Sequence, residues 1–234
     1  MRCSIRSVLI ALFATTAAAV AQVASTQPAN FPEPPAGVIR VACIGDSITF
    51  GHGIKERDRD SYPAQLGRLL GDRYSVRNFG ANGTTALRQG DRPYVARPVY
   101  AQALAYKPDV AIIGLGTNDT KPQNWTKQAD FVADYQAMIA DLRAANPAVR
   151  IFVCLPAPCY LMGETSIRSR VIDEALIPKI RTVAEQSKAG IVDLRSALDG
   201  RPELLPDTIH PNPEGARIIA EAVARAIRTP VAAQ

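Results

Sequence analysis

The stretch VACIGDSITFGHG, residues 41–53, begins as a predicted strand and ends as a glycine-rich loop. Its first half is a continuous apolar run, whereas a strand with one solvated face would alternate apolar and polar residues. The run stops at Gly45-Asp46-Ser47. The stretch therefore predicts a strand covered on both faces, whose carboxyl end presents Ser47 either as a nucleophile or as a polar residue that caps a helix.

Four more short apolar runs follow, near 74–80, 109–116, 150–156 and 190–194. Stretches with helical spacing separate or follow them, at 61–71, about 95–106, 130–147, about 168–188 and 211–227. This alternation predicts the α/β class: a flavodoxin-like, three-layer α/β/α sandwich around a five-stranded parallel sheet. In such a sheet the ligand crevice lies beyond the carboxyl ends of the strands.

The 234 residues have ordinary globular composition, 47% hydrophobic, and predict one domain over residues 39–229. Residues 1–21 have the basic start, short apolar run and small-residue cleavage site of a secretory signal peptide. The apolar run is shorter than the roughly 20 residues of a membrane anchor. We therefore expect a flexible lead-in at 22–38, a disordered tail at 230–234, a secreted or periplasmic protein, and no stable membrane association.

Charge and composition argue against two kinds of partner. The chain has 27 basic and 22 acidic residues, and loss of Arg2 and Arg6 with the leader would leave 25 − 22 = +3, without a basic stripe. We therefore expect no nucleic-acid partner. Two histidines and no His/Cys cluster offer little for a metal site. A disulfide between Cys154 and Cys159 stays open, because the two intervening prolines can either set or forbid its geometry. Nothing fixes the oligomeric state.

The polar segments at the predicted strand ends are GDSITFGHG, NFGANGTTAL and GLGTNDTK, and DTIHPNPEG precedes the last helix. The first contains no phosphate-binding, dinucleotide-binding or G-x-S-x-G motif. A serine nucleophile needs an adjacent base, and only His52 and His210 are available. Asp207, three residues before His210, can orient that imidazole, whereas His52 has no such carboxylate. We therefore expect His210 to be the base and His52 a bystander.

Together these segments resemble the four sequence blocks of the SGNH (GDSL-type) serine hydrolases, in family order across residues 40–228. The resemblance implies a Ser47, Asp207 and His210 triad and an oxyanion hole formed by Ser47, Gly83 and Asn118. Gly83 fits the family spacing from Asn78 better than Gly80, for which a turn role is the alternative. Thr208 departs from the family, which often has glycine there. No cofactor is implied.

The overall pattern is similar to sialate O-acetylesterase-like and other carbohydrate acetylesterases, which implies removal of short acyl groups from a small-molecule or glycan ester. Lys121 and Trp125 are candidate substrate contacts, although Trp125 is equally an ordinary helix-cap hydrophobe. Asp119 is expected to bind loop backbone. The alternatives are a lysophospholipase, thioesterase or arylesterase with the same site, a catalytically silent glycan-binding module, and a flavin-binding protein.

Overall fold

The protein forms a five-stranded, fully parallel sheet in the order β2-β1-β3-β4-β5. The computed structural model describes residues 34–229. The expected leader at 1–21, the first part of the lead-in and the tail at 230–234 therefore lie outside the described residues. The predicted α/β class and all five strands are confirmed. The strands are β1 (Ile39–Gly45), β2 (Tyr74–Gly80), β3 (Val110–Gly114), β4 (Arg150–Leu155) and β5 (Gly190–Asp193).

The longer helices lie where helical spacing predicted them. They are α3 (Tyr62–Leu70), α4 (Pro98–Ala105), α6 (Phe131–Ala145), α8 (Ile177–Ser187) and α10 (Pro213–Arg228). Short α-helical turns lie in the connections, at α1 (Ser47–Phe50), α2 (Arg57–Asp60), α5 (Pro122–Trp125), α7 (Ser169–Val171) and α9 (Leu194–Leu198). Short 3₁₀ turns occupy Tyr94–Ala96, Thr117–Thr120, Gln128–Asp130 and Pro202–Leu204.

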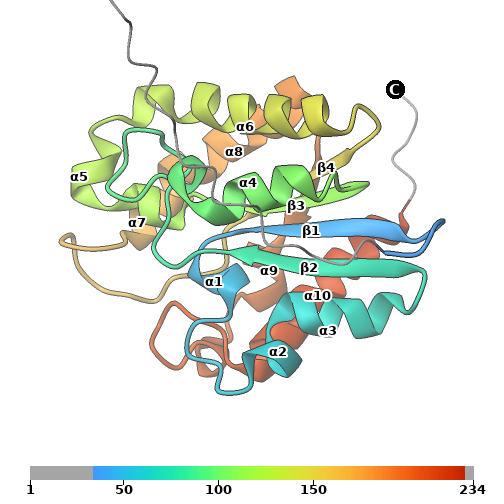
Figure 1. The fold of residues 1–234 in the computed structure, drawn as a ribbon. Helices are drawn as coiled ribbons and strands as arrows, with labels where there is room; N and C mark the ends of the chain where they lie inside the picture. Colours follow the sequence, from blue (N-terminus) through green and yellow to red (C-terminus); the bar gives the residue numbers. More distant parts are fainter. Residues whose placement is uncertain (1–33, 230–234) are drawn as a thin grey trace, which may run out of the picture.

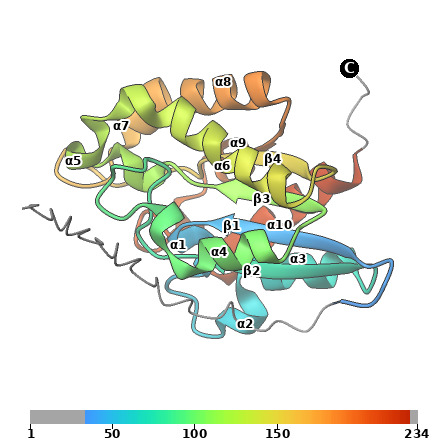
Figure 2. The same cartoon turned by 45° about the horizontal axis from the view of Figure 1, so that its top comes forward.

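The helices cover both faces of the sheet, which explains why the three central strands, β1, β3 and β4, are buried along most of their length. In Figure 1, α4, α6 and α8 lie above the sheet, while α3 and α10 lie below it. Figure 2 shows the same separation from a second direction. Each face has its own buried cluster, one including Phe79, Phe131 and Tyr135, the other including Leu66, Phe152 and Val223. The predicted three-layer arrangement is therefore present.

The predicted helix at 168–188 differs from expectation because it contains a π-helical turn, Ile172–Leu176, between α7 and α8. Pro178 follows this turn. A proline in a helix has no N–H to donate, and its ring collides with the carbonyl oxygen four residues earlier. The wider π turn accommodates that conflict without ending the helix.

Cys154 and Cys159 carry free thiols and are not joined by a disulfide. Cys154 lies in β4 and packs into the cluster around Phe152, whereas Cys159 packs into the cluster on the other face. Burial raises the pKa of the Cys43 thiol to about 12, as expected for a small hydrophobic core residue. The open question of the 154–159 bridge is therefore answered by the two thiols packing on opposite faces of the sheet.

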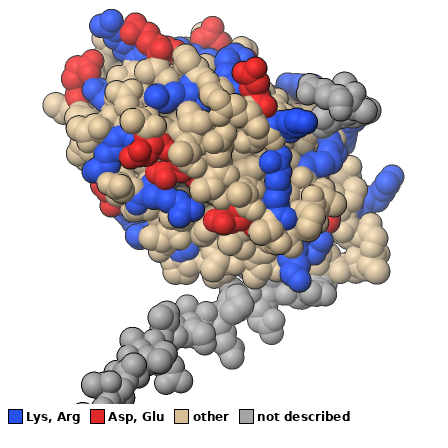
Figure 3. Space-filling model, turned by 90° about the horizontal axis from the view of Figure 1, so that it is seen from above, with Lys and Arg blue, Asp and Glu red and all other residues tan. Residues whose placement is uncertain are grey.

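Two further observations concern the outside of the molecule. Between residues 34 and 229, no helix combines the length and apolar character needed to span a bilayer. Figure 3 shows the molecule from above, the side on which α6 and α8 lie. On this face, Lys and Arg side chains are interspersed with Asp and Glu.

Candidate active site

Ser47 is the first residue of α1, and only Asp46 separates it from the end of β1. The capping residue is Asp46, whose Oδ1 accepts a hydrogen bond from the backbone N–H of Ile48 at 2.9 Å. The sequence left open that Ser47 itself caps a helix, and the structure gives that task to its neighbour. The Ser47 hydroxyl is therefore not used to satisfy the helix N-terminus.

Glycines bring α1 close against the sheet. A Cβ on Gly45 would lie 2.2 Å from Thr49 Oγ1 and 2.6 Å from the Gly114 carbonyl oxygen. A Cβ on Gly80 would lie 2.2 Å from the backbone nitrogen of Phe50. Gly80 is the last residue of β2 and not the turn residue that the sequence suggested. Its missing side chain leaves the space that the backbone of α1 occupies.

Ser47, His210 and Asp207 form a continuous hydrogen-bonded chain. Ser47 Oγ lies 2.8 Å from His210 Nε2, and His210 Nδ1 lies 2.6 Å from Asp207 Oδ2. The other Asp207 oxygen, Oδ1, accepts hydrogen bonds from the backbone N–H groups of Ile209 and His210. Partial burial acts to raise the pKa of Asp207, but these hydrogen bonds and the adjacent imidazole outweigh it and hold the pKa below its ordinary value. Asp207 is thus an ionised acceptor for His210.

The loop that carries Asp207 and His210 is shaped by Thr208. This residue has φ of +73°, the left-handed region that favours glycine. Its N–H donates to the Leu205 carbonyl at 2.7 Å, and its carbonyl accepts from the Tyr160 N–H at 2.8 Å. Threonine at position 208, where the family often has glycine, therefore still forms this turn. The turn holds the β-branched side chain of Thr208 in a strained backbone conformation.

The two further oxyanion-hole candidates, Gly83 and Asn118, come from neighbouring segments. Asn118 Nδ2 donates to the Thr84 carbonyl at 3.2 Å and makes a longer, 3.5 Å contact with Asp46 Oδ2. Gly83 has φ of +72°, and the Arg92 side chain lies beside it, with Cδ 3.5 Å from the position of an added Cβ. The bond to Thr84 fixes the Asn118 amide next to the loop that contains Gly83.

Asp119 hydrogen-bonds the backbone of the loop that follows β2. It is fully buried, and its two oxygens accept from the backbone N–H groups of Ala86 at 3.0 Å and Leu87 at 2.8 Å. The expectation that Asp119 binds loop backbone is confirmed. Burial raises the pKa of Asp119 to about 7, against the effect of these hydrogen bonds, and burial also raises the pKa of Asp46 to about 7.

Trp125, one of the two predicted substrate contacts, is packed in the interior. It is 7% exposed and its indole lies 6.3 Å, centre to centre, from the ring of Phe131. The prediction that Trp125 stacks on substrate is therefore wrong, and the alternative of an ordinary buried hydrophobe holds. The reason is that Pro122 starts a helical turn that directs the indole into the core. Lys121, the other predicted contact, is largely covered and lies 3.7 Å from Asp91.

His52 lies against the triad, which the sequence did not indicate. Its ring centre is 4.5 Å from that of His210, at an interplanar angle of 54°. Ser47 Oγ bonds to His210 Nε2, so His52 is a neighbour of the candidate base and does not occupy the base position. The glycines on both sides of His52 were the available signal, since both have positive φ, +88° at Gly51 and +79° at Gly53. Their effect on the path of the loop could not be read from spacing alone.

Comparisons with known proteins agree with this architecture. The sequence profile of the GDSL-like Lipase/Acylhydrolase family matches residues 43–218. The chain is 42% identical over 217 residues to an acetylxylan esterase of Xylanibacter ruminicola, covering 85% of this chain but 45% of that protein. The chain thus spans about half the length of this relative.

Solved structures of low sequence identity share the fold. A carbohydrate acetylesterase from Sinorhizobium meliloti superposes with a TM-score of 0.63 at 21% identity, covering 81% of this chain and 98% of that one. An acetyl xylan esterase superposes with a TM-score of 0.62 at 24% identity, over 81% and 100% of the two chains. The aryl esterase of M. smegmatis gives 0.66 at 19% identity, over 82% and 99%.

Proposed function

The chain belongs to the GDSL-like lipase/acylhydrolase family, and on that premise we propose that it is a serine esterase that removes short acyl groups, chiefly acetyl, from carbohydrates. The observation that carries the proposal is the 2.8 Å contact between Ser47 Oγ and His210 Nε2, with Asp207 on the far side of the imidazole. Family membership makes the chain a carboxylic ester hydrolase. The substrate, the triad roles and the acyl-enzyme are the proposal.

The geometry supports a two-step acyl transfer. His210 Nε2 accepts the Ser47 hydroxyl proton while Oγ attacks the ester carbonyl carbon, and the carbonyl oxygen becomes an oxyanion. Collapse of this intermediate breaks the bond to the alcohol oxygen, which takes the proton from Nε2 and leaves an acetyl-serine. Water then gives a proton to the same nitrogen and attacks the acetyl carbon. The bond from that carbon to Ser47 Oγ breaks, Oγ takes the proton back from Nε2, and acetic acid is released. Asp207 Oδ2 accepts a hydrogen bond from His210 Nδ1–H throughout, stays ionised, and so fixes the tautomer.

The oxyanion would be stabilised by three donors. These are the backbone N–H groups of Ser47 and Gly83 and the side-chain amide of Asn118. Asn118 is 4% exposed, so its dipole acts where little water screens it. One Nδ2 hydrogen donates to the Thr84 carbonyl, and the second makes the long 3.5 Å contact with Asp46, which the oxyanion would replace.

The relatives support acetyl esters as substrates. The 42% identical protein is named an acetylxylan esterase, and two of the structural neighbours are named a carbohydrate acetylesterase and an acetyl xylan esterase. The aryl esterase shares the fold as well, so an arylesterase is the second candidate. A silent glycan-binding module is disfavoured by the intact Ser47, His210 and Asp207 chain.

Hydrolysis of p-nitrophenyl acetate tests this proposal. Ser47→Ala and His210→Ala should each remove nearly all activity, about 10⁴-fold or more. Ser75→Ala, at the opposite end of β2 from the site, is the matched control and should keep wild-type turnover. A fluorophosphonate probe should add its mass to the wild type and not to the Ser47→Ala protein. Wild-type turnover by Ser47→Ala would refute the mechanism.

Export is a separate part of the proposal, since residues 1–21 have the composition of a signal peptide. Expression of the full chain in a bacterium, followed by fractionation and N-terminal sequencing, should find mature protein that begins near Gln22 outside the cytoplasm. Full-length protein retained in the cytoplasm would contradict this part alone.

A further inference from the structure

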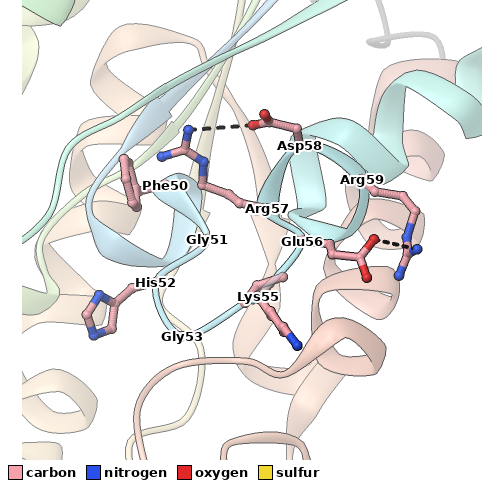
Figure 4. A pocket seen from close by; sticks show the side chains of 10 residues that line it. Phe50, Gly51, His52, Gly53, Lys55, Glu56, Arg57, Asp58 and Arg59 are labelled. Carbon is pink, nitrogen blue, oxygen red and sulfur yellow. Dashed lines mark hydrogen bonds and ion pairs between the residues drawn. The ribbon is translucent and has the colours of Figure 1, made fainter.

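The loop after α1 folds back onto the triad. The backbone N–H groups of Gly51 and His52 both donate to the Ser47 carbonyl, at 3.0 and 2.9 Å. The positive φ values of Gly51 and Gly53 allow this tight return. Figure 4 shows the result, with the His52 side chain extending from the loop next to a hollow. His52 is therefore held in place by the same residue that supplies the candidate nucleophile.

The chemistry of acyl transfer indicates which part of the ester, the alcohol or the acyl group, lies near this loop. His210 Nε2 must pass its proton to the departing alcohol oxygen, so the alcohol part of the ester lies beside the His210 ring. The acyl oxygen faces the other group of residues, Gly83 and Asn118. The His52 ring lies 4.5 Å, centre to centre, from the His210 ring, so His52 and the loop behind it border the imidazole that passes its proton to the alcohol.

The hollow inside this loop has the size and lining of a site for a polar ligand. Its volume is about 530 Å³, and Phe50 to Arg59 line it (Figure 4). This volume lies within the usual range for small-molecule sites, but the lining is dominated by charged and polar side chains instead of apolar ones. Such a lining suits a polyhydroxylated alcohol and is unsuited to an acyl or alkyl chain.

The charges in the hollow are only partly paired. Arg59 lies 2.6 Å from Glu56, and Arg57 lies 3.5 Å from Asp58 while its guanidinium covers the Phe50 ring. Lys55 is exposed and has no ion pair with any other described residue. Its ammonium group is thus a free hydrogen-bond donor in the lining of the hollow, and its side chain extends to the opposite side of Gly53 from His52 (Figure 4).

We propose that this hollow, lined by residues 50–59, binds sugar units next to the esterified one, with His52 as the wall shared with the triad and Lys55 as a hydrogen-bond donor. The inference rests on the proposed function and adds that the substrate is an acetylated sugar chain. Catalytic efficiency then rises with chain length, because each added unit that reaches the hollow contributes binding energy.

The test measures acetate release from acetylated xylo-, manno- and cello-oligosaccharides of one to four units, beside p-nitrophenyl acetate. In the wild type, kcat/KM should rise at least about tenfold from one unit to three in at least one series. In Lys55→Ala, the ratio of kcat/KM for the three-unit ester to that for p-nitrophenyl acetate should fall by about tenfold, the effect of one hydrogen bond from a charged donor. Lys179→Ala, on α8, is the matched control and should leave both rates unchanged.

His52→Ala gives a second, independent variant. It should also lower the preference for the longer ester, and its far-UV circular dichroism should match the wild type because the ring is exposed. The inference is overturned if no series shows length dependence, or if Lys55→Ala and His52→Ala change the esters in equal proportion. Loss of this preference alone leaves the esterase proposal intact, whereas an inactive wild type on every ester refutes the proposed function itself.

Discussion

Replacement of Asp119 by alanine should destabilise the protein and slow its catalysis, because Asp119 holds the loop that contains Gly83. The carboxylate is 0% exposed and accepts the backbone N–H groups of Ala86 and Leu87. Each buried donor left without a partner costs about 1–3 kcal/mol, so the two together cost about 2–6 kcal/mol. Removal of an acid whose burial raises its pKa to about 7 offsets part of this cost. The expected net loss in free energy of unfolding is about 2–4 kcal/mol.

Urea denaturation of the purified variant measures this loss. The midpoint should fall while the slope stays unchanged, and Tm should fall by roughly 5–15 °C. Asp119→Asn keeps one acceptor oxygen and should lose about half as much. Asp199→Ala, which removes an exposed carboxylate, is the matched control.

The same variant tests whether the loop positions an oxyanion donor. For p-nitrophenyl acetate, kcat should fall at least about tenfold with little change in KM, since the interaction affected forms in the transition state. A midpoint for Asp119→Ala equal to that of the control would refute the account of the loop. A large loss of stability with unchanged kcat would refute the link to catalysis.

Three more outcomes follow from buried or strained groups. Thr208→Gly should raise the free energy of unfolding by about 1–2 kcal/mol in urea titrations. The substitution relieves a positive φ and removes a buried hydroxyl that has no hydrogen-bond partner. A loss of stability would contradict this. Gly80→Ala should cost about 3 kcal/mol or more by the same titration, because its Cβ would overlap the Phe50 backbone; a wild-type midpoint would contradict that overlap. Asp46 and Asp119 have pKa values of about 7 in the fold and about 4 when unfolded, so between these values the folded state holds protons that the unfolded state has lost. Stability should therefore fall as pH rises through this window, and a Tm at pH 8 equal to or above that at pH 5 would contradict the argument.

Much of the fold was predictable because it depends on local patterns. Short runs rich in apolar and β-branched residues located all five strands, with β1 and β2 correct to the residue. The Asp207 and His210 pair was readable because both lie in one short turn. These features need no knowledge of distant contacts.

Other features depend on backbone path and on which face a side chain takes. The direction of Trp125 follows from the turn that starts at Pro122, and amphipathic spacing in a four-residue helix is too short to define a face. The contact of His52 with His210 joins residues 158 positions apart (210 − 52) and depends on two positive φ values. The capping role of Asp46 likewise could not be distinguished from one for Ser47, since both residue types cap helices.

The glycines that end β1, β2 and β3 have a consequence for how this enzyme could diversify. Gly45 is in register with both Gly80 and Gly114. Because none of the three has a side chain, α1 packs directly against the backbone at this end of the sheet. Ser47, the candidate nucleophile, therefore lies directly over the sheet, while residues 51–56, between α1 and α2, form a loop beside it. Those loops can change in length and charge without moving the serine. New substrate preferences can therefore arise by changes in these loops while the three glycines keep Ser47 in place, and library design should randomise the loops and leave Gly45, Gly80 and Gly114 unchanged.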